Sequence, residues 1–307
     1  MTRTLTYRIH DVAPYINWSY FFHAWGFPPR FSNVSRIQGC DVCRAVWLAG
    51  FPEPERAQAA EAMQLLKDAR RMLDHLDKDF HTHARFGLYP AYADGDDLIL
   101  ADPEKAGRKT RLPLLRQQHA ATPGTPNLCL ADFVRPATQG IADTVGVFAA
   151  TVDAGMEHLY EDGAYADDFK HLLAQTLADR LAEATAEKMH EEVRHTHWGY
   201  APDEHLTVEE LHAEKFIGIR PAVGYPSLPD QSANFLLDEW LGFRDIGISL
   251  TEHGAMKPHA AVSGLMFSHP AARYFAVGRI GEDQLEDYAR RRGLPMEKMK
   301  KFLAANL

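Results

Sequence analysis

One stretch of the sequence combines groups that could bind a polar ligand: "IRPAVGYPSLPDQS", from Ile219 to Ser232. Its guanidinium, Arg220, stands directly before a proline, and Gly224 and Tyr225 follow within five residues. Because proline fixes its own φ and pushes the preceding residue toward extended conformations, the pattern predicts a rigid extended ribbon and excludes a helix. Gly224 can adopt a positive φ or allow a close approach to its backbone. We expect several backbone groups of this ribbon to lie outside any ladder and to need other partners. A proline-rich loop without a binding role is the alternative.

Sixteen histidines raise the possibility of a metal centre. One stretch begins like a zinc-protease motif, but its His190 and His195 are five residues apart, about 140° around a helix, so they cannot ligate one ion from a regular helix. The alternate pairs His195 with His197 and His81 with His83 could each share a strand face. No acidic or cysteine partner stands at a diagnostic spacing from either pair. We therefore predict no metal site and assign no catalytic residue.

The cysteines are Cys40, Cys43 and Cys129, of which the first two form a lone CxxC. A zinc site would need a second pair of ligands, so a structural or an unused thiol pair is the favoured interpretation. Three cysteines are too few for a disulfide scaffold and suit a reducing compartment. The sequence contains no G-x-G-x-x-G, Walker A or G-x-S-x-G motif, so it gives no support to dinucleotide, nucleotide-hydrolysing or serine-hydrolase chemistry.

Composition sets broader limits on the class of protein. A length of 307 residues suggests about two domains or one larger one, and 46% apolar residues are ample for a core. The net charge of −9 argues against a nucleic-acid partner, which would require a basic surface. No apolar run reaches the length of a membrane span, and the first residues lack the apolar core of a signal peptide. We expect a cytoplasmic protein without a membrane partner.

Periodicity predicts the elements that must position these side chains. Two amphipathic helices are expected at residues 55–77 and 167–195, the second with Leu173, Leu177, Leu181 and Ala184 on one stripe. Residues 86–102 predict a hairpin around the turn at Asp94, Gly95 and Asp96, and residues 111–127 a loop. The remaining expected elements are strands at 145–152, 246–250, 262–267 and 273–278 and helices at 283–292 and 295–304. Strands and helices segregate, which favours an α+β fold.

Several ordered blocks of sequence together resemble one known family. The blocks are "YINWSYFFHAWG", "RQQ" with "NLCLADFVRP", "LADRLAEATAEKMHEEVRHTHWGY", "GIRPAVGYPSLPD", "LTEHGAMKPHAAVSGLMFSHP", "RYFAVGRIGEDQLEDYARRRG" and "KFLAANL". They are similar to the activation domain of cobalamin-dependent methionine synthase, over about Tyr15 to Leu307. In that family the domain is the C-terminal module of a larger enzyme. This sequence begins with its own methionine and resembles a split version, with a segment at about 26–55 that is longer than in the fused enzymes.

The resemblance implies a fold and a function. It implies a single activation domain over residues 1–307, with a strongly twisted antiparallel sheet flanked by helices and an insertion around 26–55. Such a domain binds S-adenosylmethionine and docks over cob(II)alamin on a partner chain, the cobalamin-binding core of methionine synthase. An electron from a flavodoxin-like donor and the methyl group of S-adenosylmethionine then regenerate methylcobalamin. The alternative is a module that senses S-adenosylmethionine or docks a corrinoid protein without supporting methyl transfer. A metal-dependent hydrolase is a more distant third.

The resemblance also implies the ligand-binding residues. They are Asn17, Glu183, Arg220, Ala222, Gly224, Tyr225, Tyr274 and Phe275. Arg220 would make a forked contact to the ligand carboxylate, although a surface salt bridge is an alternative role. Periodicity alone would leave Glu183 solvated, because it faces away from the leucine stripe. Core packing is the alternative for Tyr225 and Tyr274. Asn17 stands where the family has an aspartate, and it could instead cap the helix that follows.

Overall fold

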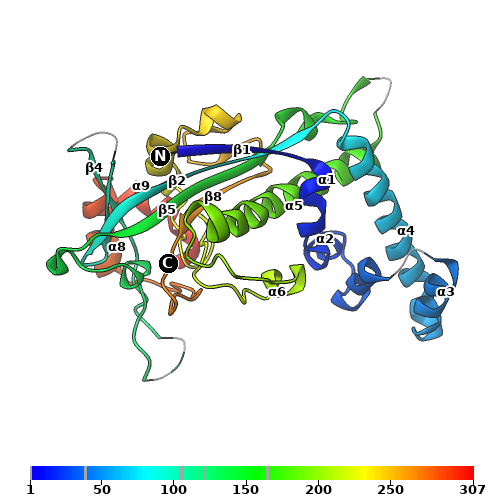
Figure 1. Cartoon of the computed structure of the whole chain (residues 1–307), viewed down its shortest axis with the longest axis horizontal. Helices are drawn as coiled ribbons and strands as arrows, with labels where there is room; N and C mark the ends of the chain where they lie inside the picture. The colour runs from blue at the N-terminus through cyan, green and yellow to red at the C-terminus, as the bar shows by residue number, and fades with distance from the viewer. Residues whose placement is uncertain (1, 38–39, 104–106, 121, 123, 164–165) are drawn as a thin grey trace.

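The computed structural model describes residues 2–37, 40–103, 107–120, 122, 124–163 and 166–307. The fold is α+β with an antiparallel sheet flanked by helices, as predicted (Figure 1). In spatial order the main strands are β4 (Lys109–Pro113), β3 (Asp97–Ala101), β2 (His81–Asp94), β5 (Asp143–Val152) and β8 (Ala261–Met266). β1 (Thr2–Arg8) pairs with β2 outside this path. Among the residues that the structure describes, no helix is long and apolar enough to cross a bilayer.

The long strand β2 organises the sheet. One of its edges pairs with β5 from Thr82 to Ala91. Its other edge is divided, since β1 pairs with its first half and β3 with its end. The predicted hairpin is confirmed, with Asp94 opposite Asp97. β2 begins at His81, earlier than the predicted start at Phe86, because the residues before Phe86 pair with β1 and β5.

Helices cover both faces of the sheet. α1 (Ile9–Val12), α2 (Trp18–Ala24), α4 (Glu53–Leu76) and α5 (Asp168–Glu192) enclose one apolar core with the sheet. α7 (Ala233–Leu241) covers a second apolar cluster that includes the other side of β5. The two long predicted helices are thus confirmed, and the leucine stripe of α5 is buried. α5 is followed by a π-helical turn, η7 (Val193–His197), which begins inside the range predicted as helix and ends beyond it.

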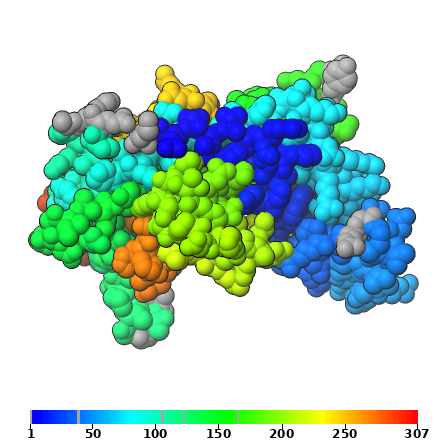
Figure 2. Space-filling model, in the orientation of Figure 1, coloured from blue at the N-terminus to red at the C-terminus, as the bar shows by residue number. Residues whose placement is uncertain are grey.

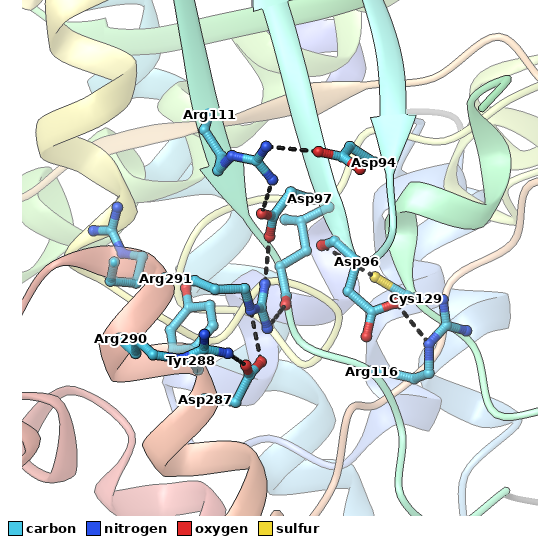
Figure 3. Close-up of polar contacts among 12 residues, drawn as sticks. Asp94, Asp96, Asp97, Arg111, Arg116, Cys129, Asp287, Tyr288, Arg290 and Arg291 are labelled. Carbon is cyan, nitrogen blue, oxygen red and sulfur yellow. Dashed lines mark hydrogen bonds and ion pairs between the residues drawn. The ribbon is translucent and has the colours of Figure 1, made fainter. Parts of the chain in front are cut away.

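The C-terminal helices are also confirmed, as α8 (Glu282–Arg292) and α9 (Met296–Phe302). An ion pair fastens α8 to the tip of the β2–β3 hairpin (Figure 3). Asp97 is buried and pairs with both Arg111 on β4 and Arg291 on α8. Nearby, Arg116 pairs with Asp96 at 2.7 Å and with Asp132 at 2.6 Å, beside the buried Cys129. The pair of Asp97 with Arg291 holds α8 against the sheet.

Two predictions of strands are wrong, the first wholly and the second in part. Residues 273–278 form no strand, because they bond to the proline-rich ribbon through single contacts such as the Val277 N–H to the Pro226 carbonyl (2.9 Å). Of residues 246–250 only β6 (Ser249–Leu250) is a strand, paired with β7 (Met256–Lys257). The predicted loop at 111–127 begins inside β4, and its residues 121 and 123 lie outside the described ranges.

Shorter helices connect these elements. They are η1 (Ala13–Tyr15), η2 (Pro29–Arg36), α3 (Asp41–Ala49), η3 (Leu130–Phe133), η4 (Ala137–Gln139), η5 (Ala154–His158), α6 (Val208–His212), η8 (Phe243–Ile246) and η9 (Ala304–Asn306). η2 and α3 lie in the segment predicted as an insertion, at the opposite end of the molecule from α8 (Figure 1). There Phe31, Trp47 and Phe51 form an aromatic cluster against the main core. The structure joins Cys40 to Cys43 by a disulfide bond, whereas the sequence favoured a structural or an unused thiol pair.

Candidate functional site

The proline-rich ribbon lies along the outer edge of β8. Ile219 and Phe267 exchange two backbone hydrogen bonds, and the Val223 N–H donates to the Ser263 carbonyl at 2.8 Å. The ribbon and β8 approach so closely that a Cβ on Gly264 would lie 2.2 Å from the Pro221 carbonyl oxygen, so only glycine fits there. The ribbon contains no helix, as predicted, but it is extended only in part, because turns at Ala222–Tyr225 and Tyr225–Leu228 interrupt it. Some of its backbone groups bond to the edge of β8, and others find partners outside a ladder, as predicted; the Arg220 N–H, for example, donates to the Tyr274 hydroxyl.

Gly224 supplies the turn that presents Tyr225. Its φ is +86°, which an L-residue rarely adopts, and its N–H donates to the Leu228 carbonyl at 2.8 Å. The first of the two predicted roles of Gly224 is therefore observed, while no heavy atom approaches the position of its missing Cβ. The turn carries the Tyr225 side chain outward, where 51% of it is exposed. Core packing is thereby excluded for Tyr225.

A cavity of about 770 Å³ opens between the ribbon, α5 and the N-terminal segment. Seven of the eight predicted site residues line it: Asn17, Glu183, Arg220, Ala222, Tyr225, Tyr274 and Phe275. Gly224 does not line the cavity and acts on it only through the turn. In Figure 2 the N-terminal segment (blue) lies beside the segment that follows α5 (yellow-green), and His212 there bonds to the Tyr15 carbonyl at 2.9 Å. Residues distant in sequence thus meet at one site.

The most strongly charged feature of the cavity is the pair formed by Arg220 and Glu187. The Arg220 Nη2 donates to Glu187 Oε2 at 3.0 Å, and both side chains are nearly buried. Burial opposes ionisation of Arg220, but Glu187, Tyr274 and Glu183 together outweigh it, so the pKa of the guanidinium is raised. The surface-salt-bridge alternative for Arg220 is therefore wrong. The Arg220 guanidinium also lies 5.9 Å from the centre of the Phe148 ring.

Each member of this pair keeps one polar atom without a partner. Among the described residues, neither Arg220 Nη1 nor Glu187 Oε1 has a hydrogen-bond partner, although both atoms are buried. An unpaired buried donor or acceptor costs about 1–3 kcal/mol, and more when it is charged. Such atoms call for a ligand or an ordered water. The cavity therefore offers one cationic donor and one anionic acceptor side by side.

A second carboxylate, Glu183, stands one helical turn before Glu187 on α5. The Tyr225 hydroxyl donates to Glu183 Oε1 at 2.6 Å. Burial and the Glu183 charge both raise the pKa of Tyr225, so the phenol stays protonated and remains a donor. Glu183 is only partly exposed, so the periodicity-based expectation of a solvated side chain does not hold.

Tyr274 binds the backbone of Arg220. Its hydroxyl accepts the Arg220 backbone N–H at 2.9 Å, and its ring packs against the second apolar cluster while also lining the cavity. The neighbouring Phe275 is held by its N–H, which donates to Ser227 Oγ at 3.1 Å. For Tyr274, core packing and a place in the site are therefore combined.

Asn17 combines its two expected positions as well. Its Oδ1 accepts the Ser19 N–H at 3.1 Å, which makes it the N-cap of α2. It also lines the cavity. Capping does not decide whether the side chain contacts a ligand, because only one of its polar atoms is engaged in this bond.

Behind the cavity, a buried polar chain supports α5. The fully buried Arg194 donates to Glu204 at 2.8 Å and to His190 Nδ1 at 2.9 Å. Burial, with the nearby charges of Arg220 and Arg194, holds the pKa of His190 well below its usual range. His190 is therefore neutral and serves as an acceptor for Arg194. Within the described ranges, no three histidine, cysteine, aspartate or glutamate side chains gather as metal ligands would.

Sequence reasoning missed several residues of the cavity. Glu187 is the most important, and its position four residues after Glu183 on the same helical face was the available signal. Glu214 also lines the cavity, where burial and the charge of Glu187 raise its pKa. Tyr20 and Arg180 also belong to the polar lining, and no pattern in the sequence distinguishes them from ordinary surface residues.

Two comparisons with known proteins find similarity to one family. The sequence matches the family described as "Vitamin B12 dependent methionine synthase, activation domain" over residues 8–293. A solved structure described as the MetH reactivation domain bound to AdoHcy is similar, with a TM-score of 0.87 and 38% sequence identity. The match covers 100% of this chain and 90% of that one.

Proposed function

This chain belongs to the family of vitamin B12-dependent methionine synthase activation domains, and from that premise we propose that it binds S-adenosylmethionine in the cavity. We further propose that it supports reductive remethylation of cob(II)alamin to methylcobalamin on a partner methionine synthase. The chain is then a component of a methyltransferase, and its own residues bind and orient the methyl donor. It would form one activation domain over residues 1–307, with an insertion around 26–55.

The observation that carries the proposal is the pair of unpartnered atoms on Arg220 and Glu187. The methionine part of S-adenosylmethionine is a zwitterion, with a carboxylate and an ammonium group on one carbon. The carboxylate would accept from Arg220 Nη1, and the ammonium would donate to Glu187 Oε1. Both orphaned atoms would thereby be satisfied by one ligand group. S-adenosylhomocysteine, the ligand of the similar solved structure, carries the same amino-acid group.

The rest of the cavity suits the remaining parts of the ligand. The aromatic side chains of Tyr20, Tyr225 and Phe275 line it and offer faces on which an adenine ring can stack. The ligand carries a sulfonium and an ammonium against one carboxylate, so its net charge is positive. Glu183, which already accepts from Tyr225, adds a carboxylate that would attract the sulfonium.

The reaction requires two partners of defined chemistry. S-adenosylmethionine supplies the methyl group and leaves as S-adenosylhomocysteine, while a flavodoxin-like protein supplies one electron. The cobalamin is carried by the cobalamin-binding core of methionine synthase. Tyr20 and Tyr225 line the cavity and are largely exposed, so the cavity is open to solvent where such a partner can approach.

The test mixes this chain with a cobalamin-binding methionine synthase core in the cob(II)alamin state, a one-electron reductant and S-adenosylmethionine labelled in its methyl group. We expect labelled methylcobalamin, seen by absorbance and by recovery of the label, and no product with Arg220→Ala. Binding of S-adenosylmethionine without product, in the presence of an active reductant, would identify the chain instead as a sensing or docking module. Absence of binding would reject the cavity as the site.

A further inference from the structure

We propose that Cys40 and Cys43 form a reversible thiol–disulfide exchange site, separate from the cavity. The structure joins the two sulfurs by a disulfide bond. The two cysteines are three residues apart in sequence, and their Cα atoms lie 5.2 Å from each other. The pair stands where α3 begins, at the end of the molecule opposite α8 (Figure 1). The proposal does not depend on the function proposed above.

The position of this disulfide argues against a role in holding the fold together. A structural disulfide stabilises mainly by closing a long loop of the unfolded chain. This one encloses only Asp41 and Val42 and joins no two elements, since Cys40 caps α3 and Cys43 lies in its first turn. Breaking the bond would free little of the chain. Such a bond can therefore open and close while the surrounding structure persists.

The helix N-terminus gives the two sulfurs different chemistry. Cys40 is the N-cap of α3, and its Sγ accepts the Cys43 N–H at 3.0 Å. Donation from the helix N-terminus stabilises a thiolate, and this arrangement lowers cysteine pKa values in CxxC motifs. Cys40 is also exposed, whereas Cys43 is half-buried. These features assign Cys40 as the attacking thiolate and Cys43 as the resolving thiol.

Cys129 provides a contrast within the same chain. It is buried, and burial raises its pKa to about 12. A thiol of this kind is neither accessible nor ionised at neutral pH, so it does not take part in exchange.

The surface around the disulfide is suited to a protein thiol. Val42, between the two cysteines, is 72% exposed, and Val46, one turn further along α3, is 67% exposed. Two exposed valines beside a reactive disulfide offer an apolar contact to the chain that carries the incoming thiol. These valines favour a protein as the partner, and its release from the mixed disulfide requires a second thiol, so the partner is a protein with two neighbouring cysteines.

The exchange balances as a two-electron reaction. One thiolate of the dithiol attacks the disulfide, forms a mixed disulfide and releases the other sulfur as a thiolate, which takes up a proton. The second thiol of the partner then resolves the mixed disulfide. The partner ends as a disulfide, and Cys40 and Cys43 end as two thiols. The reverse sequence, with a disulfide as oxidant, closes the bond again.

The first experiment equilibrates the native, full chain in buffers of reduced and oxidised dithiothreitol at fixed pH. Thiols are then trapped with a maleimide and counted by mass spectrometry. We expect two labels per chain at the reducing limit and none at the oxidising limit, with the same midpoint from both directions and Cys129 unlabelled without denaturant. A pair that stays oxidised until the protein is unfolded would overturn the proposal, as would a pair that never closes.

Matched single variants test the two assigned roles. Cys43→Ser leaves Cys40 alone, and Cys40→Ser leaves Cys43 alone. With oxidised glutathione at pH 7, we expect Cys43→Ser to form the mixed disulfide at least tenfold faster than Cys40→Ser. Equal rates, or a faster reaction in Cys40→Ser, would overturn the assignment. Binding of S-adenosylmethionine should be the same in both variants, so this test and that of the cavity can fail independently.

Discussion

Arg220 and Glu187 hold opposite charges 3.0 Å apart while each keeps one atom for another molecule. A buried ion pair of this kind adds little to stability, because desolvation offsets most of the attraction. Its value lies in orientation. Glu187 fixes the guanidinium plane, so that Nη1 is already aimed when a ligand arrives. The residue-scale predictions follow from this pair and from its neighbours Asn17 and His190.

The first prediction concerns the two partners of the zwitterion. Arg220→Ala should lose most of the affinity for S-adenosylmethionine, about 10- to 100-fold or more, because a charged hydrogen bond contributes roughly 1.5–3 kcal/mol. Glu187→Gln keeps the shape of the side chain but removes the charge and should weaken binding by about tenfold. Titration calorimetry measures both dissociation constants. Unchanged binding in Arg220→Ala would exclude this cavity as the ligand site.

The second prediction concerns Asn17, where the family has an aspartate. Asn17→Asp should bind S-adenosylmethionine about tenfold more tightly, a change of about 1.4 kcal/mol, because it adds a negative charge beside a cationic ligand. Asn17 caps α2, and aspartate caps equally well, so stability should change little. Asn17→Ala is the control, with an expected loss of about 1 kcal/mol in folding free energy. If Asn17→Asp leaves the dissociation constant within twofold, Asn17 is only a cap.

The third prediction is a pH dependence of stability that arises from His190. The folded chain holds its pKa well below 6.5, mainly by burial, so below about pH 6.5 the unfolded state takes up a proton that the native state does not. The contribution is fully present above pH 6.5 and is lost as the pH falls. Between pH 7.5 and 5.5 it amounts to about 1.4 kcal/mol.

Urea unfolding of the native protein and of His190→Gln at the two pH values measures this contribution. Glutamine keeps an acceptor for Arg194 but does not titrate, so the variant should lose about 1.4 kcal/mol less than the native protein over this interval. Identical pH slopes would show that His190 takes up a proton as readily in the folded state as in the unfolded state.

At the scale of elements, the ribbon and α8 are joined by a buried carboxylate. Asp230, at the end of the ribbon, accepts from the Tyr288 hydroxyl at 2.8 Å and from Arg292 Nε at 3.2 Å. All three side chains are buried or nearly so. The ribbon that lines the cavity is thus held at both ends, by β8 and by α8.

The fourth prediction tests this anchor. Asp230→Ala should lower the free energy of unfolding by about 3–5 kcal/mol, because it leaves the buried Arg292 without a counter-charge. Asp287→Ala is the matched control on α8. Its side chain is 41% exposed, so the loss should stay below about 1 kcal/mol. Chemical denaturation measures both, and equal effects of the two substitutions would contradict the anchoring role.

Local pattern predicted those elements whose cause is local. The helices α4 and α5 follow from apolar spacing, and the β2–β3 hairpin follows from its turn residues. The failures have long-range causes. Residues 273–278 carry a strand-like pattern but meet the irregular ribbon instead of a strand. Glu187 was missed although it stands four residues after Glu183, because this spacing places it on the polar face of α5 without showing that this face borders a cavity. The residues of the ribbon likewise gave no indication that it pairs with β8.

For the whole molecule, the fifth prediction is that this chain alone does not retain cobalamin. The family's cobalamin-binding module, with its ligand histidine, has no counterpart among the blocks that carry the resemblance. After incubation with cobalamin and gel filtration, the protein peak should show no cobalamin absorbance, whereas a mixture with a cobalamin-binding methionine synthase core should. A spectrum that persists with this chain alone would contradict the assignment of the cofactor to the partner.

The residues that line the cavity are synthesised at different times. Tyr15 and Asn17 come from the beginning of the sequence, and Tyr274 and Phe275 come from near its end. At about 5–20 residues per second, a ribosome needs roughly ten seconds to a minute to add the second wall after the first. Until Phe275 has been added, the cavity lacks part of its lining, and the nascent chain cannot bind a ligand in it as the complete cavity would. The proposed ligand can therefore stabilise only chains that have been translated beyond Phe275.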